Sequence, residues 1–174
     1  MELSQQRNEL FQAAQYDDVA RLKELLETQP QLVNMENADG LTPLGYAAHF
    51  GNKGAVDVLL RHGADVNAVS HSKVPYIPSN TALHAAIAGE RDLEVIQLLL
   101  EYKARTDIYD SNGHTCLHTA AFHDDNVDLI RLLIAHGADI NAAVEGGATA
   151  LSLAIQQGNH NVAELLRQMG ALEA

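Results

Sequence analysis

The sequence predicts an all-α solenoid of about five helix-turn-helix repeats with β-hairpin tips. The first observation is a motif at residues 39–52, reading DGLTPLGYAAHFGN, which recurs along the chain in weaker copies. The second is its spacing, because the motif threonines Thr42, Thr81, Thr115 and Thr149 recur at a nearly constant interval. The third is composition: 47% of the residues are hydrophobic but only 5% are aromatic, which suits closely stacked helices.

Each part of the 39–52 motif has a local structural meaning. Asp39-Gly40 predicts a turn, since Gly accepts positive φ and an Asp side chain can bond its own backbone. Thr42-Pro43 predicts a helix start, because Thr is a good N-cap and Pro at the first helical position loses only an unpartnered N–H. Gly51 ends this helix. A second helix follows, with an apolar stripe at helical spacing formed by Ala55, Val56, Val58, Leu59 and Leu60.

The copies of the motif keep a Thr, a Leu and an Ala at fixed positions. They read TPLGYAA from Thr42, TALHAA from Thr81, TCLHTAA from Thr115 and TALSLA from Thr149, and GADVN at 63–67 returns as GADIN at 137–141. Because both the T-P-L-H-x-A signature and a similar repeat length are typical of ankyrin repeats, the chain closely resembles the ankyrin repeat family. Gly45 and Ser152 stand where the signature has His, a departure that alters local hydrogen bonding.

The repeat boundaries predict one domain over residues 1–174. The first repeat is atypical, with Asn8 in the position that Thr42 occupies one repeat later. Terminal repeats of such arrays depart from the consensus because one of their faces meets water. We expect repeats at approximately 5–36, 37–69, 70–109, 110–143 and 144–174.

The final helix, near residues 161–169, has to cap the array. Leu165, Leu166 and Met169 leave its predicted outer face incompletely polar. This pattern predicts either fraying of the helix or pairing with a second copy. We therefore expect a monomer with weak self-association through this helix.

The longest departure from the repeat is an insert within residues 68–80. The segment from Asn67 to Thr81 is longer than the equivalent segments from Asn34 to Thr42 and from Asn141 to Thr149. Pro75 and Pro78 restrict themselves and their preceding residues to extended conformations. The stiffened loop is expected to display Val74, Tyr76 and Ile77. Two interpretations stay open: these side chains contact a partner, or they fold back over the concave surface of the array.

The resemblance implies a function as well as a fold. Ankyrin repeats generally bind other proteins through their hairpin tips and the concave face of their first helices. Transferred by position, exposed first-helix residues include Ala85, Thr119 and Leu153. Aromatic anchors among polar residues are typical of a protein-binding surface, although Phe50 and Phe122 could instead pack between repeats. The candidate partner-binding residues are Leu41, Tyr46, His49, Phe50, Val74, Tyr76, Ile77, Tyr109, Asn112, His114, Phe122 and His123.

The formal charge of −12, from 23 acidic and 11 basic residues, argues against nucleic-acid binding, which relies on clustered Lys and Arg. Acidic residues are predicted on the solvent face of the second helices, at Glu24, Glu27, Asp57, Glu94, Glu101 and Asp128. A solvated acidic face is the simplest interpretation. The alternative function is a regulatory or inhibitory subunit whose acidic surface covers a basic site on an enzyme.

Metal binding and catalysis are weakly supported by the sequence. His114, Cys116, His118 and His123 lie in one short segment, as zinc ligands can. However, the resemblance implies that His84 and His118 bond the motif Thr and the neighbouring turn. No P-loop, G-x-S-x-G, H-E-x-x-H or G-x-G-x-x-G motif is present. We therefore predict a non-enzymatic protein without cofactor or metal.

The remaining sequence expectations concern location. Residues 1–8 have neither a basic region nor an apolar run, so no secretory signal is expected. No apolar stretch approaches the length of a membrane span. The single Cys116 cannot form an intramolecular disulfide. These features predict a soluble cytoplasmic protein without membrane attachment.

Overall fold

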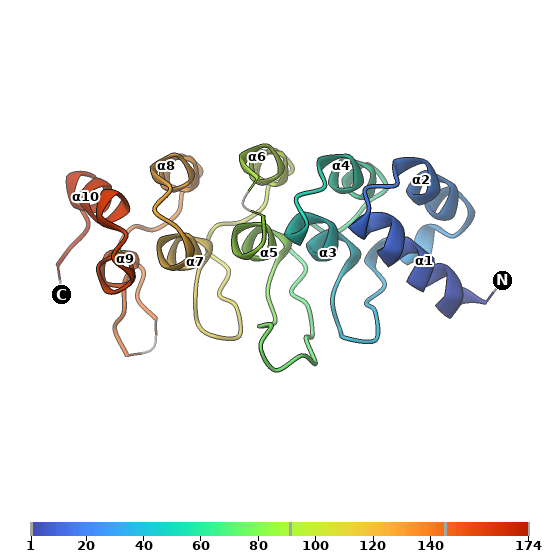
Figure 1. The fold of residues 1–174 in the computed structure, drawn as a ribbon, viewed down its shortest axis with the longest axis horizontal. Coiled ribbons are helices and arrows are strands. Elements are labelled where there is room, and N and C mark those ends of the chain that lie inside the picture. Colours follow the sequence, from blue (N-terminus) through green and yellow to red (C-terminus); the bar gives the residue numbers. More distant parts are fainter. Residues whose placement is uncertain (1, 91, 145, 174) are drawn as a thin grey trace. The chain divides into compact units, whose positions relative to one another are not determined.

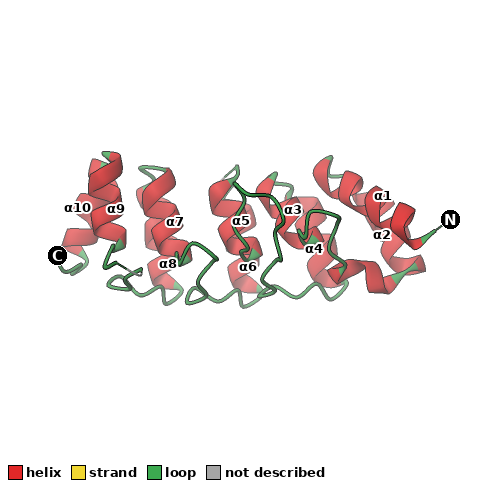
Figure 2. Cartoon of the chain, turned by 90° about the horizontal axis from the view of Figure 1, so that it is seen from below, coloured by secondary structure: helices red, strands yellow, loops and turns green. Residues whose placement is uncertain are grey.

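The computed structural model describes residues 2–90, 92–144 and 146–173. The chain divides into two compact units, the first ending at Ala104 and the second beginning at Arg105. Each unit is a two-layer stack of helix pairs, with the connecting loops projecting from the layer that holds the first helix of each pair (Figures 1 and 2). Within the described residues there are five such pairs, as the repeat pattern predicts.

The first unit holds three helix pairs. Helices α1, α3 and α5 form one layer, and α2, α4 and α6 form the other (Figure 1). A short 3-10 helix, η1, follows α2 and leads into the loop before α3. The bounds are α1 Leu3–Gln15, α2 Val19–Thr28, η1 Pro30–Asn34, α3 Pro43–His49, α4 Lys53–Arg61, α5 Ala82–Ala88 and α6 Leu93–Glu101.

The second unit holds two helix pairs with the same arrangement. Helices α7 and α9 form one layer, and α8 and α10 the other. The bounds are α7 Cys116–His123, α8 Val127–Ala135, α9 Ala150–Gln157 and α10 His160–Gln168.

The all-α prediction is confirmed, since the regular structure in the described residues is helical. Within the described residues, the hairpin tips are tight turns and not extended ladders. In these tips the N–H groups of Asn37 and Asp110 donate to the carbonyls of Leu41 and His114, at 3.0 and 2.8 Å. An isolated antiparallel bridge joins Ala143 to Thr149.

The motif threonines begin the inner helices, as the sequence predicts. Thr42 Oγ1 accepts the N–H of Gly45 at 3.0 Å. At Thr81, Thr115 and Thr149 the bond is reciprocal, because the third helical residue returns a side-chain contact to the cap. Gly45 has no side chain to return this bond, so α3 has only half of the capping arrangement.

The core of each unit lies between its two layers. Alanines of the inner helices, such as Ala47 and Ala48, are buried and let the layers approach closely. The outer helices contribute large side chains that are almost fully inaccessible to solvent. Burying each of these contributes roughly 1.5–3 kcal/mol. These buried side chains of the outer helices include Leu22, Leu26, Leu59, Ile96 and Leu99 in the first unit, and Leu129, Ile130 and Leu133 in the second.

Polar side chains link one helix pair to the next. Asp17 Oδ1 accepts the N–H of Ala55 at 2.7 Å, at the start of α4. Asn52 Nδ2 donates to the carbonyls at the end of α1, on Ala14 and Gln15, at 2.8 and 2.7 Å. In the second unit, Asp125 Oδ1 accepts the N–H of Val162 at 2.8 Å in the same way. These bonds satisfy helix ends that would otherwise lack partners.

Some exposure predictions are wrong. Ala85, Thr119 and Leu153 are expected on the exposed inner-helix face but are buried. Thr119 also satisfies its hydroxyl internally, donating to the Thr115 carbonyl at 3.2 Å.

The prediction for the final helix also needs correction. Leu165 and Leu166 are buried, because this face of α10 packs toward α8 and α9. Met169 is 40% exposed. The two leucines therefore give no support to fraying or self-association of α10.

Candidate protein-binding surface

The insert at 68–80 is an internally bonded loop. At its base, Ser70 N–H donates to the Asn80 carbonyl at 2.9 Å, and Asn80 N–H donates back to Ser70 Oγ at 3.0 Å. Further along, Ser72 N–H donates to Ser79 Oγ at 3.0 Å. The loop therefore has two rungs that hold its two sides together.

The tip of the insert is a four-residue turn. Ile77 N–H donates to the Val74 carbonyl at 3.1 Å, with Pro75 in the second position. The second position of such a turn favours proline, because the ring fixes φ close to the value that the turn requires there. The turn excludes a continuous extended conformation from Val74 to Ile77.

The insert is attached to the 37–41 tip that precedes α3. His71 N–H donates to the Gly40 carbonyl, and Lys73 N–H donates to the Asp39 carbonyl, both at 2.9 Å. His71 Nδ1 lies 2.7 Å from Glu36 Oε2. A side chain at position 40 would collide with the His71 carbonyl, so Gly40 is required by the contact as well as by its φ of 78°. The attachment holds the insert against the neighbouring repeat.

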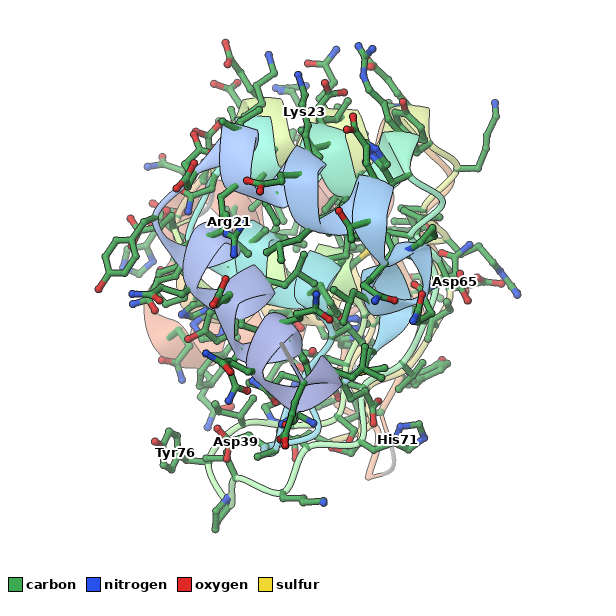
Figure 3. All side chains as sticks on the ribbon, turned by 90° about the vertical axis from the view of Figure 1, so that its right-hand side faces the viewer. Arg21, Lys23, Asp39, Asp65, His71 and Tyr76 are labelled. Carbon is green, nitrogen blue, oxygen red and sulfur yellow. The ribbon has the colours of Figure 1, made fainter. Side chains whose placement is uncertain are left out.

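Tyr76 projects from the insert into solvent. Its side chain is 85% exposed, whereas Val74 and Ile77 are less accessible than Tyr76. Figure 3 shows the insert below the helices, with Tyr76 and His71 pointing to opposite sides of it. Tyr76 thus does not fold back over the array.

An aromatic row crosses the inner layer of the first unit. Tyr46 meets Phe11 and Phe50 edge to face, with ring centroids 5.2 Å apart in both pairs. His49 is exposed and packs on Phe50 at 5.1 Å. Tyr46, Phe50 and the nearby tip residue Leu41 are half-buried. Phe50 therefore packs on its own helix and remains partly accessible.

The second unit holds the other candidate residues. Phe122 is 40% exposed and packs edge to face on His123, with centroids at 5.3 Å. Tyr109 is 48% exposed, beside a turn that includes the exposed Asn112. This turn is organised by Asp110 Oδ1, which accepts the N–H groups of Asn112 and His114, each at 2.9 Å.

His114 is half-buried, and it stacks on His118 with centroids at 5.9 Å. His118 is buried, and its Nδ1 accepts the Thr115 N–H at 3.1 Å. Its Nε2 therefore carries the proton and donates to the Ala142 carbonyl at 2.9 Å. Burial lowers the pKa of His118. The ring is a neutral bridge between the helix start and the next tip, as the resemblance implies.

Cys116 is buried with its Sγ 3.6 Å from the Thr106 carbonyl, and burial raises its pKa to about 12. The positions of Cys116 and His118 are thus explained by structural bonds. Within the described residues, no three His, Cys, Asp or Glu side chains converge as metal ligands.

We expect the Cys116 thiol to resist alkylation in the folded protein, because only the thiolate reacts. Iodoacetamide labelling at pH 8, followed by mass spectrometry, should show little modification without urea and complete modification after unfolding. Rapid labelling of the native protein would contradict the buried position.

A polar hollow of about 430 Å³ lies beside α1 and α2. It is lined by Glu9, Gln12, Ala13, Tyr16, Asp18 and Arg21. Its charged groups have internal roles: Arg21 pairs with Glu9 and Glu24, and Asp18 accepts the Arg21 N–H at 3.1 Å as the cap of α2. The charged side chains that line the hollow are therefore occupied by ion pairs and a helix cap within the chain, and they do not need a catalytic role to explain their positions.

Sequence reasoning misses several residues of this surface. The pattern indicates only a turn at Gly40, since the contact that excludes a side chain comes from the insert. Tyr16, which follows α1 and is 70% exposed, is also missed. The offset of one repeat that relates Asn8 to Thr42 places Tyr16 in the position of Phe50, so this aromatic residue was detectable.

No helix in the described parts of the chain combines the length and the apolar character that crossing a bilayer requires.

The acidic residues predicted on the outer helices are exposed, apart from the half-buried Asp57, whose Oδ2 lies 2.9 Å from Arg61 Nε. The molecule thus presents acidic outer helices and partly exposed aromatic residues on its inner helices and tips.

Paired helices, threonine-capped inner helices and glycine-bearing tips define a helical repeat protein. A family model for ankyrin repeats, in three copies, matches residues 10–110 and 83–172. The chain belongs to the ankyrin repeat family, whose domains are generally non-catalytic protein-protein interaction modules.

Several relatives share only part of their length with this chain. The nuclear factor NF-kappa-B p105 subunit of Gallus gallus is 34% identical over 79% of this chain and 14% of its own length. A putative ankyrin repeat protein of Fowlpox virus is 33% identical over 74% and 37%, respectively. The Arabidopsis thaliana serine/threonine-protein kinase VIK is 37% identical over 58% and 21%. The chain spans well under half of the length of each of these relatives. The similarity therefore covers only part of each relative.

Proposed function

We propose that this chain is a non-catalytic module that binds a partner protein through the insert and the exposed residues of its inner helices. The observation that carries the proposal is the insert. Its two internal rungs and its attachment at Gly40 fix the loop before any partner arrives, while Tyr76 remains exposed. A preorganised loop loses less conformational entropy on binding, so more of the contact energy appears as affinity.

The aromatic side chains support the same surface. Tyrosine is enriched among residues that dominate binding energy, because it offers a large rigid ring and a polar end. Tyr46 and Phe50 in the first unit, and Tyr109 and Phe122 in the second, supply further candidate anchors. His49, His123 and Asn112 supply polar contacts beside them.

The acidic composition favours a second version of this function, in which the partner is an enzyme whose basic site is covered. Between Arg105 and Arg167 the sequence has a single Lys or Arg, Arg131, which lies on the outer helix α8. This version predicts an affinity that falls steeply with salt, because screening weakens attraction between exposed charges. An affinity that is unchanged between low and high salt would exclude it.

The test of the proposed function compares three immobilised proteins: the wild type, Tyr76→Ala and Tyr102→Ala. Tyr102 is also exposed, but it follows the outer helix α6 and serves as the matched control. We expect a discrete protein from a source lysate to be retained by the wild type and by Tyr102→Ala, and to be reduced about tenfold by Tyr76→Ala, as loss of a binding hot spot requires.

Circular dichroism should show that all three proteins keep the same helical signal and melting temperature. Equal retention by the three proteins would remove Tyr76 from the binding surface. Absence of any retained protein would count against the proposed function itself.

A further inference from the structure

Asn112 and Gly113 form the one asparagine-glycine pair in the sequence. The pair lies in the tip before α7, where Asn112 is exposed and its carboxamide makes no hydrogen bond within the described chain. A Cβ at Gly113 would meet no atom within 4 Å among the described residues. An accessible carboxamide therefore precedes a backbone nitrogen in open surroundings.

We propose that Asn112 is a site of spontaneous deamidation. The Gly113 nitrogen attacks Asn112 Cγ, so that a C–N bond forms while the carboxamide nitrogen takes up the proton of the attacking nitrogen and leaves as ammonia. Water then opens the resulting succinimide ring at either of its two carbonyl carbons. One opening gives aspartate. The other gives isoaspartate, in which the main chain continues through the side-chain carboxyl group.

Glycine at the following position favours ring closure. Its nitrogen is not shielded by a side chain, and its backbone reaches conformations that other residues rarely adopt. Because the attacking nitrogen and the carboxamide belong to adjacent residues, the reaction is intramolecular and needs no enzyme.

The turn that contains Asn112 controls how often the attack can occur. The Gly113 N–H donates to the Asp110 carbonyl at 3.0 Å. Asp110 Oδ1 accepts the N–H groups of Asn112 and His114, each at 2.9 Å. The attacking nitrogen must leave the Asp110 carbonyl, so the turn has to open first. Exposed loop tips open at a low cost in free energy, which makes this step accessible in the folded protein.

The equivalent tip of the first unit is covered. Asp39 and Gly40 precede the capping Thr42 by the same intervals at which Asn112 and Gly113 precede Thr115. There the insert donates to both carbonyls, and the His71 carbonyl occupies the space beside Gly40. The tip before α7 has no such cover at Gly113 within the described chain.

Several other asparagines use their carboxamide groups in structural bonds and are followed by residues with a side chain. Their carboxamides accept backbone N–H groups or donate to backbone carbonyls of neighbouring helices and turns, so a further group must be displaced before attack. These residues are Asn37, Asn52, Asn126 and Asn159.

Deamidation would change the second unit at a residue that belongs to the proposed partner-binding surface. Aspartate adds a negative charge beside Asp110. Isoaspartate lengthens the main chain inside the turn, which is incompatible with the bond from the Asp110 N–H to the His114 carbonyl at 2.8 Å. The reaction itself does not depend on the proposed function, but its consequence for binding does.

The experiment incubates the full folded chain at pH 8 over several weeks and maps its peptides by mass spectrometry, with fragmentation that separates aspartate from isoaspartate. We expect conversion at Asn112 to be at least about tenfold faster than at any other asparagine. Both products should appear. Conversion that is no faster than elsewhere would overturn the assignment, and aspartate without isoaspartate would overturn the succinimide route.

Two variants test the role of the turn. Asp110→Ala removes the acceptor of two N–H groups and should speed conversion of Asn112 about threefold, because the turn opens more often. Asn37→Ala is the matched control, since Asn37 Oδ1 accepts the N–H groups of Asp39 and Leu41 in the equivalent tip. It should leave the rate at Asn112 unchanged. Equal rates in the two variants would show that opening of the turn does not limit the reaction. Circular dichroism should confirm that both variants keep the helical signal of wild type.

This experiment and the capture experiment can fail independently. Deamidation is measured from peptide masses and needs no partner. If a partner is retained but Asn112 stays intact, only the deamidation site is wrong. If Asn112 is converted but no protein is retained by the fresh chain, the proposed function fails and the modification site remains.

Discussion

Gly40→Ala is expected to release the insert from the 37–41 tip and to destabilise the protein by more than a glycine substitution normally does. Two costs add at this position. A φ of 78° costs an L-residue about 1–2 kcal/mol. The new Cβ would also collide with the His71 carbonyl, so the bond from His71 N–H to the Gly40 carbonyl must break.

Gly113→Ala is the matched control for this prediction. Gly113 also lies in a hairpin tip, and its φ of 79° is nearly identical, but a Cβ there would meet no atom within 4 Å in the described chain. It should therefore show the conformational cost alone. The difference between the two variants isolates the contact with the insert.

Amide hydrogen exchange is the measurement that separates the outcomes. In Gly40→Ala the N–H groups of His71 and Lys73 should exchange at least about tenfold faster than in wild type, as loss of about 1.4 kcal/mol of local protection requires. In Gly113→Ala they should not change. Equal exchange in both variants would show that the insert does not depend on the Gly40 contact.

His118→Leu is expected to have the second large effect. The replacement leaves the Thr115 N–H and the Ala142 carbonyl without their partner, and each unsatisfied buried group costs about 1–3 kcal/mol. His136→Leu is the control, since His136 is exposed and, among the described residues, its ring bonds the Leu132 carbonyl one turn earlier. Urea denaturation should show a loss of about 2–4 kcal/mol for the first variant and a much smaller loss for the second.

The same histidine predicts a pH dependence of stability. Burial lowers the pKa of His118 in the folded protein, whereas the unfolded chain titrates near the ordinary value of about 6.5. The unfolded chain therefore binds more protons as the pH falls below that value. The stability from the neutral ring is present above about pH 6.5 and is lost as the pH falls from there through the folded pKa.

Denaturation of wild type and His118→Leu at several pH values tests this dependence. The stability difference between them should shrink as the pH falls from about 8 to about 5. A difference that stays constant would mean that His118 does not titrate differently in the two states. Comparison with the variant removes the contributions of the other histidines and of the carboxylates.

The features that can be predicted from the sequence depend on neighbours within one repeat. The threonine caps, the apolar stripe from Ala55 to Leu60 and the bridging role of His118 follow from local spacing and from the family resemblance. Features that depend on distant segments are not predictable in this way. The contact of Gly40 with His71 joins residues of different repeats, and the burial of Leu165 depends on how α10 packs on its neighbours. Tyr16 is overlooked, although the repeat offset indicates it.

The attachment of the insert also determines where mechanical load enters the molecule. If a partner binds Tyr76 as proposed, force applied through it acts on a loop whose backbone donates to the carbonyls of both Asp39 and Gly40. The pull therefore passes into the main chain just ahead of α3 as well as into the segment before α5. Two neighbouring repeats share the tension, so dissociation under load strains two helix pairs at once.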